Sequence, residues 1–141
     1  MYLLDTNVVS ELRKAGTGQA HPAVTRWAAA VDPVVLHLSV VSIMEIEIGI
    51  LRLARRDGAQ AERLRSWLER QVLTAFAGRI LAVDLPVARR CAQLLVPDPK
   101  VDRDALIAAT AHVHGLTVVT RNTADFQATG VTILDPWTHT P

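Results

Sequence analysis

Four acidic residues stand where carboxylates can act together, just after an apolar run or near the start of an expected helix. They are Asp5, Glu45, Asp104 and Asp125. Carboxylates brought close together repel one another strongly unless a cation lies among them. Ligands made only of oxygen favour Mg²⁺ or Mn²⁺ over zinc. Because Mg²⁺ held by a few carboxylates and waters commonly serves phosphate-ester chemistry, the four residues indicate a reaction of that kind.

Each of these acids also has a simpler explanation in helix capping. Ser42 and Glu45 have the spacing of a capping box, in which the glutamate satisfies a backbone donor. Asp104 at a helix start interacts favourably with the helix dipole. Asp5 and Asp125 stand at similar cap-like places. Capping explains each acid singly, but the occurrence of all four at one predicted edge favours a shared site.

Short apolar runs alternate with amphipathic stretches along the whole chain. Strands are expected at Tyr2–Leu4, Val34–Val41, Ile80–Val83, Leu116–Thr120 and Val131–Leu134. Helices are expected at Thr6–Arg13, Pro22–Val31, Ser42–Arg56, Gln60–Phe76, Pro86–Leu95, Asp104–His114 and Thr123–Gln127. This alternation predicts an α/β fold, a three-layer α/β/α sandwich around a central, mostly parallel five-stranded sheet. The carboxyl ends of parallel strands share one edge, where ligands bind, so the acids are expected there.

Length and composition limit the classes of protein to consider. A chain of 141 residues is expected to form a single domain, residues 1–141. The net charge of +1 excludes a strongly basic nucleic-acid binder. The lone cysteine, Cys91, excludes an internal disulfide and a cysteine-based zinc site, and its apolar surroundings place it in the core. No signal peptide or membrane-spanning run is evident, so a cytoplasmic protein without membrane association is expected.

Several enzyme and signalling classes lack their defining residues here. The sequence contains no G-x-G-x-x-G, no G-K-[ST] loop and no G-x-S-x-G. A response-regulator receiver domain needs a lysine after its last strand, and neither Lys14 nor Lys100 can occupy that place. A haloacid-dehalogenase-like phosphatase would have D-x-D after its first strand, where this chain has Asp5-Thr6-Asn7.

Four stretches, together with the end of the chain, resemble the PIN-domain family. They are LLDTNVVSEL at 3–12, LSVVSIMEIEIG at 38–49, DALIAATA at 104–111, TVVTRNTADF at 117–126 and ILDPW at 133–137. More narrowly, the chain is similar to VapC toxins of bacterial type II toxin–antitoxin pairs, in the FitB-like branch. The resemblance extends over essentially the whole sequence.

This resemblance implies a metal-dependent ribonuclease with its acids at defined positions. The family's four acidic positions fall on Asp5, Glu45, Asp104 and Asp125, and Mg²⁺ or Mn²⁺ is expected among Asp5, Asp104 and Asp125. Polar positions near the site fall on Thr6, Asn7, Ser42, Thr120 and Asn122. Asp102 lies two residues before Asp104, but only Asp104 is in register with the LIAATA stretch.

The resemblance also implies a substrate and partners. The expected reaction is hydrolysis of RNA phosphodiester bonds to leave 3′-hydroxyl and 5′-phosphate ends. The expected partners are a second copy of the chain and a small VapB-like antitoxin whose disordered tail folds onto the toxin. Trp27 and Val31 are candidates for an apolar contact surface, with a core position for Trp27 as the alternative. A PIN-like or receiver-like binding module without catalysis is the alternative function.

Overall fold

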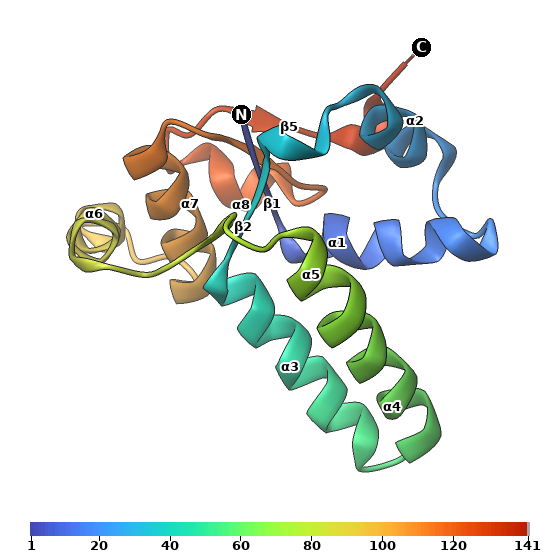
Figure 1. Cartoon of the computed structure of the whole chain (residues 1–141). Coiled ribbons are helices and arrows are strands. Elements are labelled where there is room, and N and C mark those ends of the chain that lie inside the picture. Colours follow the sequence, from blue (N-terminus) through green and yellow to red (C-terminus); the bar gives the residue numbers. More distant parts are fainter. Residues whose placement is uncertain (141) are drawn as a thin grey trace.

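A central parallel sheet organises the fold. The computed structural model describes residues 1–140, and within them five strands form one sheet in the order β3-β2-β1-β4-β5. The strands are β1 (Tyr2–Leu4), β2 (Leu36–Ser39), β3 (Ile80–Leu81), β4 (Thr117–Val119) and β5 (Ile133–Leu134). Every neighbouring pair runs parallel, with β1 in the middle (Figure 1). The predicted α/β fold with a five-stranded sheet is therefore confirmed, and the sheet is parallel throughout.

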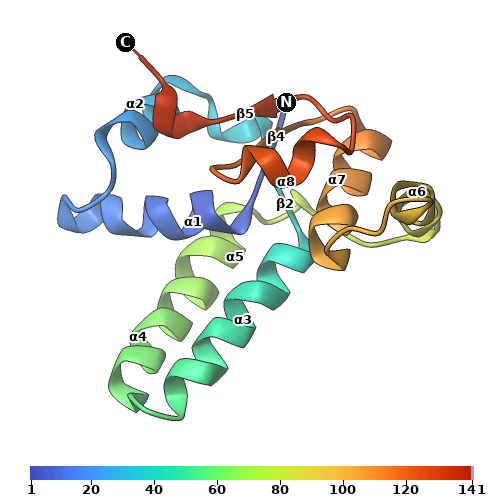
Figure 2. The same cartoon turned by 180° about the vertical axis from the view of Figure 1, so that it is seen from behind.

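Helices cover both faces of the sheet. The helices are α1 (Thr6–Arg13), α2 (Pro22–Ala30), α3 (Val40–Ala54), α4 (Gly58–Trp67), α5 (Leu73–Ala75), α6 (Leu85–Leu95), α7 (Asp102–His114) and α8 (Thr123–Gln127). A π-helical turn, Leu68–Val72, joins α4 to α5. The antiparallel pair formed by α3 and α4 projects from the body of the molecule in both views (Figures 1 and 2). None of the helices within residues 1–140 combines the length and apolar character needed to cross a membrane.

The middle strand is buried because it supplies apolar side chains to both faces. Leu3 and Leu4 are both fully buried. Successive side chains of a strand point to opposite faces, so the two leucines enter different cores. Leu4 packs in a cluster with residues of α1, α2 and α3, whereas Leu3 packs with Ile107 of α7 and Phe126 of α8. These two cores produce the three layers and fix the end of β1 in the centre of the molecule.

The boundaries around β2 differ from the prediction because local caps end the strand early. Asp32 accepts a hydrogen bond from the backbone N–H of Val34 and starts a 3₁₀ turn, Pro33–Val35. Ser39 Oγ accepts a hydrogen bond from the Val41 N–H at 3.0 Å, so α3 begins at Val40. The expected strand Val34–Val41 is therefore shorter, and the following helix starts before Ser42.

Two expectations about side chains have different outcomes. Cys91 is buried, as predicted. Trp27 is only 3% exposed and its ring packs edge-on against Tyr2, with 5.4 Å between the ring centroids. The idea that Trp27 offers an apolar surface to a partner is wrong, because its indole is part of the core.

Candidate active site

Asp5 lies at the carboxyl end of β1, where the sheet changes direction. The chain runs from β1 to β2 on one side, whereas β4 and β5 lie on the other side of β1. In open α/β sheets, ligands bind at such a switch point. Asp5 Oδ1 accepts a hydrogen bond from the Thr6 N–H at 2.8 Å, and Oδ2 accepts one from Thr120 Oγ1 at 2.8 Å. Asp5 as a residue is 5% exposed, and these donors hold its carboxylate in one orientation.

Polar residues around Asp5 tie the end of β1 to the end of β4. Thr120 is fully buried, and its Oγ1 accepts hydrogen bonds from Asn7 Nδ2 at 3.3 Å and the Asn122 N–H at 3.0 Å. Asn7 Oδ1 in turn accepts a hydrogen bond from the Arg121 N–H. Three of the predicted polar positions, Asn7, Thr120 and Asn122, thus belong to one network that positions Asp5.

Glu45 joins the same edge from α3. Its Oε1 accepts a hydrogen bond from Thr6 Oγ1 at 2.7 Å, and its Oε2 lies 3.6 Å from the guanidinium of Arg103. The capping-box alternative for Glu45 is wrong, because Ser39 caps α3 and Glu45 lies in the second turn. Ser42 is buried inside the helix, and its hydroxyl finds no hydrogen-bond partner among the described residues. The structure therefore does not link Ser42 to the acids, and its place in the site stays a prediction.

Asp104 lies in the first turn of α7, half-buried among the other acids. Burial raises its pKa to about 6, helped by the charges of Asp5, Asp125 and Glu45 and opposed by Arg103. Asp5, Asp125 and Glu45 are therefore all close enough for their charges to act on Asp104. The starts of α1 and α3 lie side by side next to the same end of α7 (Figures 1 and 2).

Asp102 differs from Asp104 although both stand in the first turn of α7. The Asp102 side chain is exposed. Burial raises the pKa of the Cys91 thiol, and the nearby charge of Asp102 raises it further. The register with the LIAATA stretch had favoured Asp104. The half-buried position of Asp104 among the acids is consistent with that choice.

Asp5 and Asp125 complete the cluster. Burial raises the pKa of Asp5, its hydrogen bonds with Thr120 and Thr6 lower it, and the charges of Glu45 and Asp125 raise it again. Asp125 lies exposed in the first turn of α8 and acts on Asp5 and Asp104 through its charge. The cluster is therefore strongly negative, with buried, hydrogen-bonded Asp5 at its centre.

The donor set fits a hard divalent cation. All four acids offer oxygen, and the raised pKa values of Asp5 and Asp104 reflect burial first and then the neighbouring negative charges, which a cation would offset. No three His, Cys, Asp or Glu residues in the part of the chain that the structure describes are arranged to enclose an ion by themselves. Mg²⁺ usually keeps several waters and takes only one or two carboxylates directly, which suits this looser arrangement.

Arg103 is a residue of the site that the sequence analysis missed. Among the ion pairs of residues 1–140, its pair with Glu45 is the only one that involves one of the four acids. Arg103 directly precedes Asp104 and lowers the pKa of that neighbour. The sequence carries no local signal for this pair, because Arg103 and Glu45 lie on helices that are distant along the chain.

Comparison with known proteins now identifies the family. The family model described as PIN domain matches residues 2–131. The chain belongs to the PIN-domain family. This PIN domain is 38% identical to the VapC ribonuclease Y4jK of Sinorhizobium fredii, over 97% of this chain and 98% of that protein. The resemblance inferred from the sequence motifs is thereby confirmed.

Solved structures of this family have the same fold. The crystal structure of FitAcB from Neisseria gonorrhoeae contains a chain 37% identical to this one, with a TM-score of 0.87 over 98% of this chain and 99% of that chain. A toxin–antitoxin complex from Klebsiella pneumoniae contains a chain 27% identical, with a TM-score of 0.69 over 96% of this PIN domain and 98% of that chain.

Proposed function

We propose that this PIN domain is a metal-dependent endoribonuclease and the toxin of a type II toxin–antitoxin pair. The observation that carries the proposal is the set of four carboxylates at the switch point, where burial and the neighbouring acidic charges raise the pKa values of Asp5 and Asp104. The similarity to a VapC ribonuclease over nearly the whole of both chains supports RNA as the substrate. The similarity to a chain in a toxin–antitoxin complex supports a small VapB-like antitoxin as the partner.

The carboxylates of Asp5, Asp104 and Asp125 would hold Mg²⁺ or Mn²⁺, directly or through waters bound to the ion. When bound, the ion makes hydroxide available from water near neutral pH and offsets negative charge at the reacting phosphate. Hydrogen bonds from Thr6 and Thr120 hold Asp5 in one orientation for this role. Asn7 and Asn122 hold Thr120 in place and thereby support Asp5.

Glu45 orients the attacking water and accepts its proton. Thr6 and Arg103 each contact a different oxygen of this carboxylate, which fixes its plane beside the other acids. Water adds to phosphorus in line with the P–O3′ bond, which breaks. The departing 3′ oxygen takes up a proton to leave a 3′-hydroxyl, and the other fragment keeps a 5′-phosphate. No side-chain nucleophile is required.

The test is RNA cleavage by the purified protein after its antitoxin has been removed. Single-stranded RNA should be cut in Mn²⁺ or Mg²⁺, and EDTA should abolish the cleavage until the metal is restored. Adding the antitoxin back should inhibit cleavage, because the toxin is expected to be inactive while the antitoxin is bound. In the cytoplasm it is expected to act only after release from the antitoxin. Undiminished cleavage in excess chelator would rule out the metal-dependent mechanism, and RNA binding without cleavage would favour the non-catalytic alternative.

A further inference from the structure

A groove leads away from the acids between α1 and α3. It has a volume of about 280 Å³ and begins at Thr6 and Glu45. One wall is the face of α1 that carries Ser10 and Arg13, and the other is α3 as far as Leu53, a rise of roughly 12 Å from Glu45. Arg56, Leu64 and Trp67 close its far end. We call this the α1–α3 groove.

The floor of the α1–α3 groove is apolar and open. Ile46 and Ile50 are buried beneath it, at 8% and 2% exposure. Gly49 lies between them on an exposed part of α3, and a methyl group built at this glycine would meet no atom within 4 Å. The missing side chain at Gly49 therefore helps to keep the groove open beside the catalytic edge.

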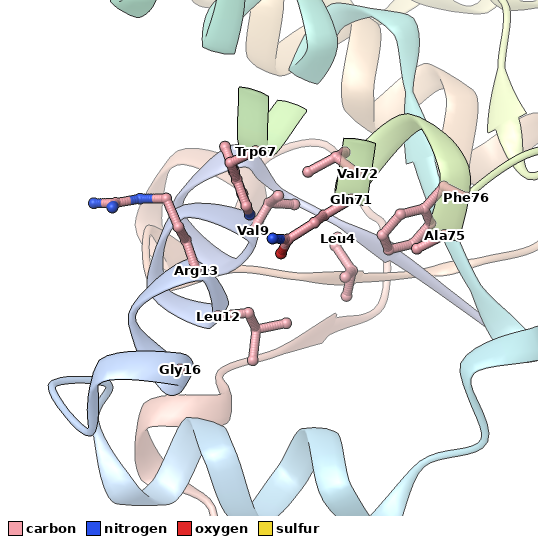
Figure 3. Close-up of a pocket in the computed structure, with 10 residues that line it drawn as sticks. All are labelled: Leu4, Val9, Leu12, Arg13, Gly16, Trp67, Gln71, Val72, Ala75 and Phe76. Atoms are coloured by element: carbon pink, nitrogen blue, oxygen red, sulfur yellow. The ribbon is translucent and has the colours of Figure 1, made fainter. Parts of the chain in front are cut away.

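The far part of the α1–α3 groove is positively charged. Arg13 and Arg56 are both exposed, and neither belongs to any of the ion pairs within residues 1–140. Trp67, which is half-buried, lines the groove with them. Arg13 and Trp67 also border a separate apolar pocket. Figure 3 shows this pocket, and in it the guanidinium of Arg13 extends away from the other residues that line the pocket. Arginines without acidic partners beside an indole suit phosphates and a stacked base.

The α1–α3 groove offers charged and apolar groups side by side, which suits an occupant that carries both phosphates and bases. An RNA strand has phosphates for the two arginines and bases for the apolar floor, and it must pass Glu45 to be cut.

We infer that the α1–α3 groove binds the single-stranded RNA that flanks the scissile phosphate, with Arg13 and Arg56 contacting phosphates and Trp67 stacking on a base. This assignment rests on the proposed ribonuclease function. In that function the scissile phosphate lies at the acids, and the α1–α3 groove then holds the nucleotides next to it. An extended peptide is the competing occupant.

The test is the salt dependence of RNA binding, measured by fluorescence anisotropy with a labelled 20-nucleotide single-stranded RNA in EDTA, where no cleavage is expected. Each phosphate contact on a single strand contributes about 0.7 to the slope of log K against log salt concentration. The double variant Arg13→Gln/Arg56→Gln should therefore lower the slope by about 1.4. The control Arg26→Gln/Arg89→Gln removes two exposed arginines from α2 and α6 and should leave the slope within about 0.3 of the wild-type value.

A second variant tests the shape of the groove without removing charge. Gly49→Gln places a side chain in the α1–α3 groove, and glutamine favours a helix more than glycine does, so folding should be preserved. RNA affinity should fall at least fivefold at low salt.

Unchanged slopes and affinities in a protein that still cleaves RNA in Mn²⁺ would overturn the groove assignment and leave the proposed function intact. Variants that bind RNA normally but bind the antitoxin more weakly would show that the groove binds a peptide. This result would also overturn the assignment of the groove to RNA. If the slope of the arginine double variant falls as expected but the wild-type protein does not cleave RNA in Mn²⁺, the result would support RNA binding in the groove and count against the ribonuclease proposal.

Discussion

Among single residues, Asp104 shows most clearly that the charged site costs folding stability. Its pKa is about 6 in the folded protein against an ordinary value of 3.8, mainly because of burial and then because of the neighbouring carboxylates. A carboxyl group whose pKa is raised by folding binds its proton more tightly in the folded state. Its contribution therefore destabilises the fold above pH 6, and the penalty decreases as the pH falls from about 6 towards 4.

Asp104→Asn should consequently raise the melting temperature of the metal-free protein. In EDTA at pH 7.5 the variant should melt at a higher temperature than the wild type, because the cost of burying a charged carboxylate is removed together with its repulsion by Asp5, Asp125 and Glu45. The difference should narrow at pH 5, where the wild-type side chain is largely protonated. Differential scanning fluorimetry at the two pH values measures both effects, and a variant that melts lower at pH 7.5 would contradict this electrostatic account.

Glu45→Gln separates charge from shape at the second carboxylate. The amide oxygen can still accept the hydrogen bond from Thr6, but the negative charge that faces Arg103 is lost. Folding should be preserved, while cleavage slows by about a hundredfold or more, which corresponds to roughly 2.7 kcal/mol of transition-state stabilisation. One melting curve and one cleavage assay measure the two quantities. Wild-type cleavage by the folded variant would remove Glu45 from the catalytic group.

At the scale of elements, two serines at the start of α3 have opposite roles. Ser39 Oγ caps the helix through the Val41 N–H, so Ser39→Ala should cost about 1 kcal/mol of stability. Ser42 Oγ is buried without a hydrogen-bond partner among the described residues, so Ser42→Ala should leave stability unchanged or raise it slightly. Urea denaturation of both variants tests the pair. A larger loss for Ser42→Ala than for Ser39→Ala would mean that the hydroxyl has an unrecognised partner.

The same region shows what the sequence can and cannot predict. The central place of Tyr2–Leu4 was predictable, because a short run that is apolar on both faces must be covered on both sides. The end of β2 was not, because Val40 and Val41 are β-branched residues typical of strands, and the cap at Ser39 overrides their preference. The π-helical turn that interrupts the expected helix Gln60–Phe76 also leaves no clear signal in an amphipathic pattern.

The candidate site was predictable to the extent that the topology was. Asp5, Glu45, Asp104 and Asp125 were expected at one edge from the alternation of strands and helices, and the structure brings their charges together there. The contacts of individual side chains were beyond such reasoning. The pairing of Arg103 with Glu45 joins two helices distant in sequence, and no local spacing encodes it.

At the scale of the whole molecule, an exposed apolar stripe follows one side of α3. Val40, Met44 and Leu51 are 38%, 44% and 58% exposed and are spaced four and seven residues apart, as on one helix face. We predict that the chain forms a homodimer and that this stripe, and not Trp27, lies in its interface. Light scattering at micromolar concentration should give twice the chain mass of 15.4 kDa, and Leu51→Glu should reduce it to the monomer mass. A wild-type protein that is monomeric under these conditions would contradict the homodimer.

We expect RNA cleavage to depend on the clustered acids and not on the general acidity of the start of α7. Asp102 and Asp104 allow the most direct test, because both lie in the first turn of α7 and only Asp104 is placed among the other acids. The measurement is the rate of single-stranded RNA cleavage in Mn²⁺ by the antitoxin-free variants Asp102→Asn and Asp104→Asn. We expect a near wild-type rate for Asp102→Asn and a loss of about a hundredfold or more, roughly 2.7 kcal/mol, for Asp104→Asn. Equal rates for the two folded variants would contradict the assignment of the active site.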